Sequence, residues 1–150
     1  MCSVGREGEG GDVRPTAKRR WRTWAYRGLL GVAVLGTLGF LTMSWQIESA
    51  VDAAGSAAVG EYGGDRVNAL IAFADSPSHS LRDRNRAVWA LGQIGDGHAL
   101  PFLEKQYTGK PCDHNRTLCQ RELEKAVRLC RGGVNLPALV WRHGTMSRGD

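Results

Sequence analysis

An uncharged stretch of twenty residues, 28–47, constrains this chain more than any other feature of its sequence. As an α-helix the stretch would be about 30 Å long, which matches the hydrocarbon core of a bilayer. A helix satisfies its own backbone hydrogen bonds, as any segment in lipid must. The sequence therefore predicts one transmembrane helix over 28–47, with the lipid bilayer as its surroundings.

The net charge of +5 is concentrated before this span. Residues 1–27 hold seven Lys and Arg against three Asp and Glu, whereas residues 48–150 hold thirteen against twelve. Basic residues beside a span mark its cytoplasmic side. We therefore expect a cytoplasmic N-terminus and an extracytoplasmic C-terminal domain, on the periplasmic side of a bacterial inner membrane. The nearly neutral domain argues against a nucleic-acid partner, because phosphate binding requires a basic surface.

A cleaved signal peptide is the alternative interpretation of the same apolar stretch. The alanines of residues 50–58 could supply the small side chains of a cleavage site. However, the core of a signal peptide has about 7 to 15 apolar residues, and the leader here is long. The sequence favours an uncleaved anchor.

Composition divides the rest of the chain into four segments. Residues 1–27 form a disordered basic leader, in which residues 3–15 have too little apolar content to order themselves. Residues 48–64 are rich in Ala and Gly and predict a linker, in which the helix of the span frays before it breaks at the last two glycines. Residues 65–142 form the folded domain, and residues 143–150 a disordered tail.

Apolar residues recur with a helical period through the folded domain, so the predicted fold class is all-α. Ser80 and Asp83 have the spacing of a capping box at a helix start. Gly95 can supply the left-handed residue that ends this helix, and Asp96 can cap the next one. The four expected helices cover residues 67–74, 80–94, 98–107 and 115–131.

Two of these helices share a pattern of residues: Arg84, Ala87, the run ALGQIGD over 90–96 and the run ALPFL over 99–103. This pattern resembles HEAT repeats of the short bacterial kind. In that family Ala and Gly let paired helices approach closely, a Gly-Asp turn joins them, and Leu fills the core. The resemblance is strong over 84–107 and loose over 65–75 and 115–131. It implies a small α-solenoid that binds another protein, because stacked helix pairs offer extended surfaces without enclosed polar pockets.

Arg82, Arg84, Arg86 and Trp89 are the candidate partner-binding residues. Arginines near the start of a helix oppose its dipole, and Arg82 and Arg86 also repel each other at i,i+4, so an anionic group should face them. That group is either a carboxylate of this chain, namely Asp83, Asp96 or one on a neighbouring helix, or an acidic partner surface or lipid head group. Trp89 stands where the repeat family usually has a small or polar residue, which indicates a partner on that side.

The cysteines of the domain predict one disulfide bond. Cys119 and Cys130 are eleven residues apart, about 16 Å along a helix, which is too far for a bond. Cys112 can fold back on the first turn of the same helix, so we predict a Cys112–Cys119 disulfide, with Cys130 as a buried thiol. Reduced structural thiols remain an alternative, as does a metal or redox site that adds His114.

No catalytic motif occurs in the sequence, because His79, His98 and His143 have no Ser or Cys neighbour at the spacing of a nucleophile and its base. We therefore expect neither enzymatic activity nor a cofactor. An accessory lyase is an alternative, since the short repeats resemble those of chromophore lyases. A thiol or metal sensor that uses the Cys112/Cys119 region is another.

The apolar residues 134–141 could cover the exposed apolar surface that an incomplete solenoid leaves. The domain holds little more than two repeat equivalents, whereas solenoids generally need three or more. Pro137 disfavours a helix in this segment. We expect an extended C-terminal strip, which includes Trp141 and packs against the flank of the helices.

Overall fold

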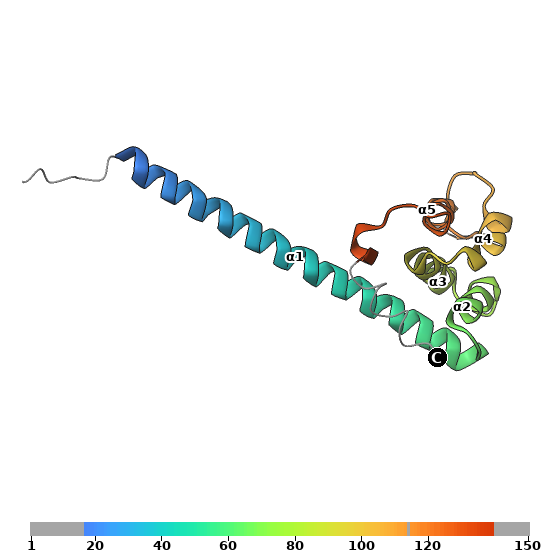
Figure 1. The fold of residues 1–150 in the computed structure, drawn as a ribbon. Coiled ribbons are helices and arrows are strands. Elements are labelled where there is room, and N and C mark those ends of the chain that lie inside the picture. The colour runs from blue at the N-terminus through green and yellow to red at the C-terminus, as the bar shows by residue number, and fades with distance from the viewer. Residues whose placement is uncertain (1–16, 114, 140–150) are drawn as a thin grey trace, which may run out of the picture. The chain divides into compact units, whose positions relative to one another are not determined.

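The computed structural model describes residues 17–113 and 115–139, and these contain helices and turns but no strand. The prediction of an all-α fold is confirmed. A 3-10 turn, η1 (Gly97–Ala99), precedes the fourth α-helix. The α-helices are α1 (Ala17–Tyr62), α2 (Arg66–Asp75), α3 (Leu81–Ile94), α4 (Leu100–Gln106) and α5 (Gln120–Cys130) (Figure 1).

The chain divides into two compact units, Met1–Gly39 and Phe40–Asp150. In the first unit, six large apolar side chains between Leu29 and Leu38 are each at least 50% exposed. Over Trp24–Tyr62, α1 is long and apolar enough to cross a membrane, a property that transmembrane helices share with signal sequences. Between Leu29 and Leu38 the helix of the first unit thus has an apolar surface.

α1 extends beyond the predicted span at both ends. Residues 17–27 of the predicted leader are helical, as are residues 48–62 of the predicted linker. Alanine is the best helix former, and five alanines between residues 50 and 58 explain why the helix does not fray. Gly63 and Gly64, with φ of 69° and 74°, end it in the left-handed region that glycine favours. Residues 1–16 lie outside the described chain.

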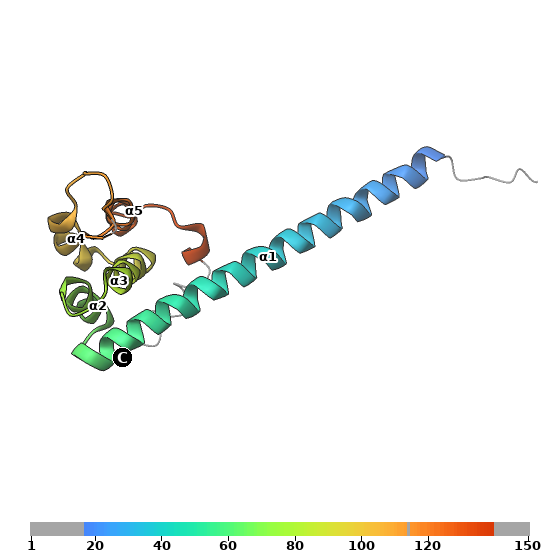
Figure 2. The same ribbon diagram turned by 180° about the vertical axis from the view of Figure 1, so that it is seen from behind.

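The core of the second unit is built from leucines of four helices. α3 lies between α2 and α5 in both ribbon views, and α4 packs against α5 (Figures 1 and 2). Val51 and Ala58 of α1 join this core, so the predicted linker is part of the packed domain. The fully buried leucines are Leu70, Leu91, Leu103 and Leu123.

Gly92 lets α3 and α5 approach closely. A Cβ atom at this position would lie 2.8 Å from the Cα atom of Ala126, too close for ordinary packing. The two helices can therefore lie this close together only because Gly92 has no side chain. This is the role that the resemblance to HEAT repeats implied for the small residues.

The turns on either side of α3 confirm the sequence analysis. The Ser80 hydroxyl accepts the Asp83 N–H at 3.2 Å and donates to its carboxylate at 2.6 Å. Gly95 ends α3 with φ of 69°. Asp96 accepts the N–H of His98 at 2.9 Å, and this bond lowers the pKa of Asp96 below its ordinary value, although burial opposes the shift.

α5 begins five residues later than predicted. The carbonyl of Asp113 accepts the N–H groups of Arg116 at 3.3 Å and Thr117 at 3.0 Å, and its carboxylate accepts the N–H of Asn115 at 3.1 Å. Aspartate often closes a turn in this way. Residues 115–117 therefore form a separate turn, and Cys119 becomes the N-cap residue of α5.

The tail contains one helical turn, over residues 136–139. The carbonyl of Asn135 accepts the N–H of Leu139 at 3.2 Å, and Pro137 falls in the first turn, where a missing N–H does no harm. Ala138 is fully buried, which fits a tail that covers the helices. Trp141, like all of residues 140–150, lies outside the described chain.

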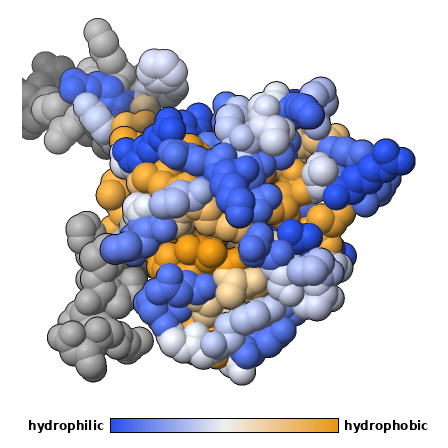
Figure 3. Space-filling view, turned by 90° about the vertical axis from the view of Figure 1, so that its right-hand side faces the viewer, coloured by the Kyte–Doolittle hydropathy of each residue, from blue (hydrophilic) through white to orange (hydrophobic). Residues whose placement is uncertain are grey.

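The surface of the second unit differs from that of the first. On the face shown in Figure 3, hydrophilic side chains cover most of the surface, and apolar residues emerge in patches between them. Such a surface suits contact with water and with other proteins.

Candidate functional site

Arg84, one of the four candidate binding residues on α3, is engaged inside the domain. Its Nε donates to the carbonyl of Ala74 at 2.7 Å, and its Nη2 to the carbonyl of Asp75 at 3.4 Å. These carbonyls lie at the C-terminal end of α2, where a cation is favoured by the helix dipole. Arg84 thus fastens α2 to α3 through two backbone carbonyls, whereas the sequence analysis expected either a carboxylate of this chain or an anionic group outside it.

Arg82 and Arg86 have different surroundings. Both side chains are exposed, and neither forms an ion pair within the part of the chain that the structure describes. The repulsion expected between them at i,i+4 is therefore not relieved by a carboxylate of the described helices. These two arginines remain available to an anionic group from outside.

Arg86 lies at an apolar groove of about 350 Å³ between α1 and α3, which we call the alanine groove. Four alanines of α1 form one wall, and Phe73 and Ala87 contribute from α2 and α3. The charged side chains at the groove are those of Asp83 and Arg86, of which Asp83 already accepts from Ser80. The alanines are Ala50, Ala53, Ala54 and Ala57.

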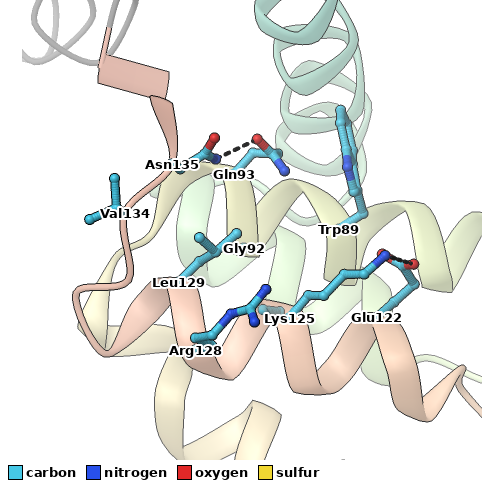
Figure 4. A pocket seen from close by; sticks show the side chains of 10 residues that line it. Trp89, Gly92, Gln93, Glu122, Lys125, Arg128, Leu129, Val134 and Asn135 are labelled. Atoms are coloured by element: carbon cyan, nitrogen blue, oxygen red, sulfur yellow. Dashed lines mark hydrogen bonds and ion pairs between the residues drawn. The ribbon is translucent and has the colours of Figure 1, made fainter. Parts of the chain in front are cut away.

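Trp89 belongs to another hollow, of about 410 Å³, between α3 and α5 (Figure 4). Asn135 Nδ2 donates to Gln93 Oε1 at 2.8 Å on one wall of it, and Lys125 pairs with Glu122 at 3.0 Å on another. The structure therefore does not bring Trp89 and Arg86 into one pocket, although the sequence grouped them together.

Cys112 and Cys119 come together as the sequence predicted, but no bond joins them. Their Sγ atoms are 2.8 Å apart, whereas a disulfide bond is about 2.05 Å long, so the predicted disulfide is absent and both residues are free thiols. Cys130 also carries a thiol and not a disulfide. It is buried as predicted, and its Sγ donates to the carbonyl of Leu91 at 3.6 Å.

The sulfur of Cys112 lies at the start of α5. It accepts the N–H of Arg121, a residue of the first helical turn, at 3.4 Å. A hydrogen bond from the Cys119 thiol and this N–H lower the pKa of the Cys112 thiol, while desolvation acts against them. Unpaired N–H groups at a helix start favour a negative charge nearby, so the site stabilises a thiolate on Cys112.

Gln120 attaches the cysteine-bearing loop to α5, and the sequence analysis missed it. The side chain is only 7% exposed, and its Oε1 accepts the N–H of Thr108 at 2.7 Å and its hydroxyl at 3.2 Å. Its Nε2 donates to the carbonyls of Gln106 and Leu118, both at 3.3 Å. The sequence feature that could have indicated its burial is its position one turn before the buried Leu123, on the apolar face of the helix.

A hollow of about 640 Å³ opens beside both sulfurs, between the loop 107–112 and the first turns of α5. Within the described residues, no group of three His, Cys, Asp or Glu side chains could hold a metal ion. His114, which the alternative metal site requires, lies outside them. The described part of this site is thus a pair of thiols.

The described histidines make structural contacts. His79 stacks on Phe73 with ring centroids 3.7 Å apart, and its Nε2 lies 3.2 Å from Glu61 Oε1 and 3.2 Å from the Tyr62 hydroxyl. These bonds attach the turn before α3 to the end of α1. His98 Nδ1 lies 2.8 Å from the carboxylate of Asp96. His143 falls outside the described residues.

Comparison with known proteins connects α3 and α4 to a repeat family. Residues 83–106 match the PBS lyase HEAT-like repeat family, a segment that contains the Arg84 anchor, the Gly92 contact and the turn at Gly95. No curated protein and no solved structure matches the chain. The predicted resemblance is thereby confirmed over this helix pair, which is similar to one HEAT-like repeat.

Proposed function

We propose that this chain is a single-pass membrane protein that displays a HEAT-like helical domain on the extracytoplasmic side, where the domain binds another protein. The observation that carries the proposal is the exposed arginine pair Arg82 and Arg86, on the helix that matches the repeat family, for which residues 17–113 and 115–139 supply no ion pair. Helical repeats of this kind present extended surfaces to partner proteins. The membrane part rests on the exposed apolar surface of α1 and on the excess of Lys and Arg before residue 28.

Binding suits the alanine groove and the hollow beside Trp89 better than catalysis does. Most of their polar side chains already have partners within the domain: Glu122 pairs with Lys125, Asn135 with Gln93, and Asp83 with Ser80. An active site requires polar groups that converge on a substrate. The proposed function therefore includes neither a reaction nor a cofactor.

The partner that fits best presents an acidic helix. Arg82 and Arg86 would pair with carboxylates, and the small side chains of the alanine groove would let a helix backbone approach closely. The groove begins at Ala50, three residues beyond the predicted span, which is about 5 Å along a helix. The partner would thus be bound at the membrane surface.

The membrane part is tested with the full chain. A reporter enzyme fused after Asp150 should be active only in an exported compartment, and the purified protein should retain residues 28–47 by mass spectrometry. A soluble product whose N-terminus falls between residues 48 and 58 would mean a cleaved signal peptide. Reporter activity in the cytoplasm would overturn the orientation.

The binding part is tested by photo-crosslinking in cells, with the crosslinker at Ala53 in the alanine groove. A discrete adduct is expected, and the double substitution Arg82→Glu/Arg86→Glu should reduce it about tenfold, as loss of two desolvated charge contacts predicts. Lys105→Glu on α4 reverses one exposed charge elsewhere and serves as the control. An adduct that survives the double substitution unchanged would contradict the proposed contact.

A further inference from the structure

We propose that Cys112 and Cys119 are a reversible dithiol pair that reacts by exchange with a disulfide, with Cys112 as the attacking thiol and Cys119 as the resolving one. The site uses residues 107–113, residues 115–119 and the start of α5, and none of the residues that carry the proposed partner contact. It therefore goes beyond the binding function and stands without it.

The two sulfurs are already placed for bond formation. They must approach by only about 0.8 Å to reach the length of a disulfide bond. The backbone between them is folded back by the turn at Asp113, whose carbonyl accepts the N–H groups of Arg116 and Thr117. Closing this ring costs little additional chain entropy, because the structure has already brought its ends together.

Both ends of the ring are fixed to the helical domain. The N–H of Cys119 donates to Asn85 Oδ1 of α3 at 2.8 Å. The neighbouring Gln120 holds the loop before Cys112 through Thr108, at 2.7 Å. The two sulfurs are therefore kept together by contacts from outside the ring, and these contacts do not require the disulfide.

The two thiols differ in exposure, which assigns their roles. Cys112 is partly exposed beside the 640 Å³ hollow, and its sulfur accepts an N–H at the start of α5, where a thiolate is stabilised. Cys119 is only 7% exposed, so an oxidant from solvent reaches Cys112 first. Cys130 is buried at the other end of α5, about 16 Å from Cys119 along the helix.

The exchange takes place in two steps. The Cys112 thiolate, having released its proton to solvent, attacks one sulfur of a small disulfide; the S–S bond of that disulfide breaks, and one thiolate leaves. Cys119 then loses its proton and attacks the Cys112 sulfur, which expels the second thiolate and forms the Cys112–Cys119 bond. The two protein thiols are oxidised, and the small disulfide is reduced to two thiols that take up the two protons.

The first experiment treats the reduced full chain in detergent with oxidised glutathione and maps its peptides after alkylation. Trypsin cleaves after Arg116 and Arg121, so the two cysteines fall on the separate peptides 106–116 and 117–121. The expected product is these two peptides linked, two hydrogens lighter than the separate thiols, with Cys130 in peptide 129–131 still alkylated. A link that involves Cys130, or no link at all, would overturn the pair.

Single substitutions test the assigned roles. Cys119→Ser should accumulate a stable glutathione adduct on Cys112, whereas Cys112→Ser should slow modification of Cys119 by about tenfold, because the buried thiol must react alone. Cys130→Ala, the matched control, should still form the bond. A Cys119→Ser protein with no adduct on Cys112 would show that Cys112 is not the attacking thiol.

Alkylation rates of the wild-type chain test the same assignment of roles to Cys112 and Cys119, with no substitution that could disturb folding. With limiting iodoacetamide, the peptide that carries Cys112 should be alkylated about ten times faster than those that carry Cys119 and Cys130. Equal rates for Cys112 and Cys119 would overturn the assignment of roles.

Discussion

The helix pair α3–α4 and the segment 107–120 that follows it are held in place by different contacts. In the pair, apolar and small residues do the packing: Leu91 and Leu103 are buried, and Gly92 meets the backbone of α5. In the segment, polar groups hold the chain, and Gln120 alone makes four hydrogen bonds to Gln106, Thr108 and Leu118.

This difference explains which region resembles a known family. Packing of a helix pair depends on residue size at fixed positions along one face, so related repeats must share a local pattern. A loop held by one buried amide depends on partners that any residue can supply, because most of them are backbone groups. The match accordingly ends at residue 106, where the polar contacts begin.

The largest expected effect breaks the apolar packing of α4 in the core, where it lies against α5. Leu103→Ala removes a fully buried side chain and should lower the free energy of unfolding by about 2 to 5 kcal/mol. Chemical denaturation followed by circular dichroism measures the loss. Leu136→Ala truncates a leucine that is 62% exposed, so this control should change stability by less than about 0.5 kcal/mol. Equal losses in both variants would contradict a core at Leu103.

Most of the fold follows from patterns that are local in sequence. The apolar stripes of α2 and α3, the cap at Ser80 and the left-handed Gly95 each depend on neighbours within about one turn, and all of them were predicted correctly. The start of α5 was not, because the Asp113 turn competes for the N–H groups of residues 115–117. Residues 48–62 were expected to form only a frayed end of the helix, because their glycines and serines resemble a linker, whereas α1 continues through them and their alanines pack against the domain.

The candidate site was predictable only in part. The spacing of Cys112 and Cys119 predicted correctly that their sulfurs lie close together, but it did not predict that no bond joins them. The anchoring of Arg84 depends on the carbonyl ends of α2, which only the packed structure places beside it. The partner of Arg82 and Arg86 remains a prediction, because no carboxylate of the described residues forms an ion pair with them.

The second prediction concerns Gly92. Replacing a glycine within a helix by alanine usually stabilises the helix, and here we expect the opposite. Gly92→Ala should destabilise the domain by about 1 to 3 kcal/mol, because its new Cβ would press on the backbone of α5 at Ala126. Gly60→Ala in α1 is the control: nothing lies within 4 Å of a Cβ there, so it should be neutral or stabilise by up to about 1 kcal/mol. Unfolding curves that shift the same way for both would show that the close approach does not limit the packing.

The third prediction tests the polar anchor of the loop. Gln120→Ala leaves the carbonyls of Gln106 and Leu118 and the N–H of Thr108 without this partner, and should cost about 1 to 2 kcal/mol. Hydrogen exchange at the Thr108 amide should become faster, while exchange in α3 changes little. Gln106→Ala, which loses only an exposed bond to Asp75, should leave the Thr108 exchange unaltered. Unchanged exchange at Thr108 in Gln120→Ala would contradict the anchor.

The smallest effect concerns the turn between α3 and α4, and it depends on pH. Asp96→Ala removes the cap on His98 and should cost about 1 kcal/mol at pH 7. Because the pKa of Asp96 is lowered in the folded state, the charge-dependent part of this stability is present above its ordinary value of about 3.9 and is lost as the pH falls through the folded value. The difference between wild type and Asp96→Ala, measured by denaturation from about pH 5 to pH 3, below the range in which histidine side chains usually change charge, should therefore shrink on acidification. Asp96→Asn keeps a capping oxygen that does not titrate, so its difference from Asp96→Ala should stay constant over the same range. If the wild-type difference also stays constant, the cap does not depend on the charge of the carboxylate.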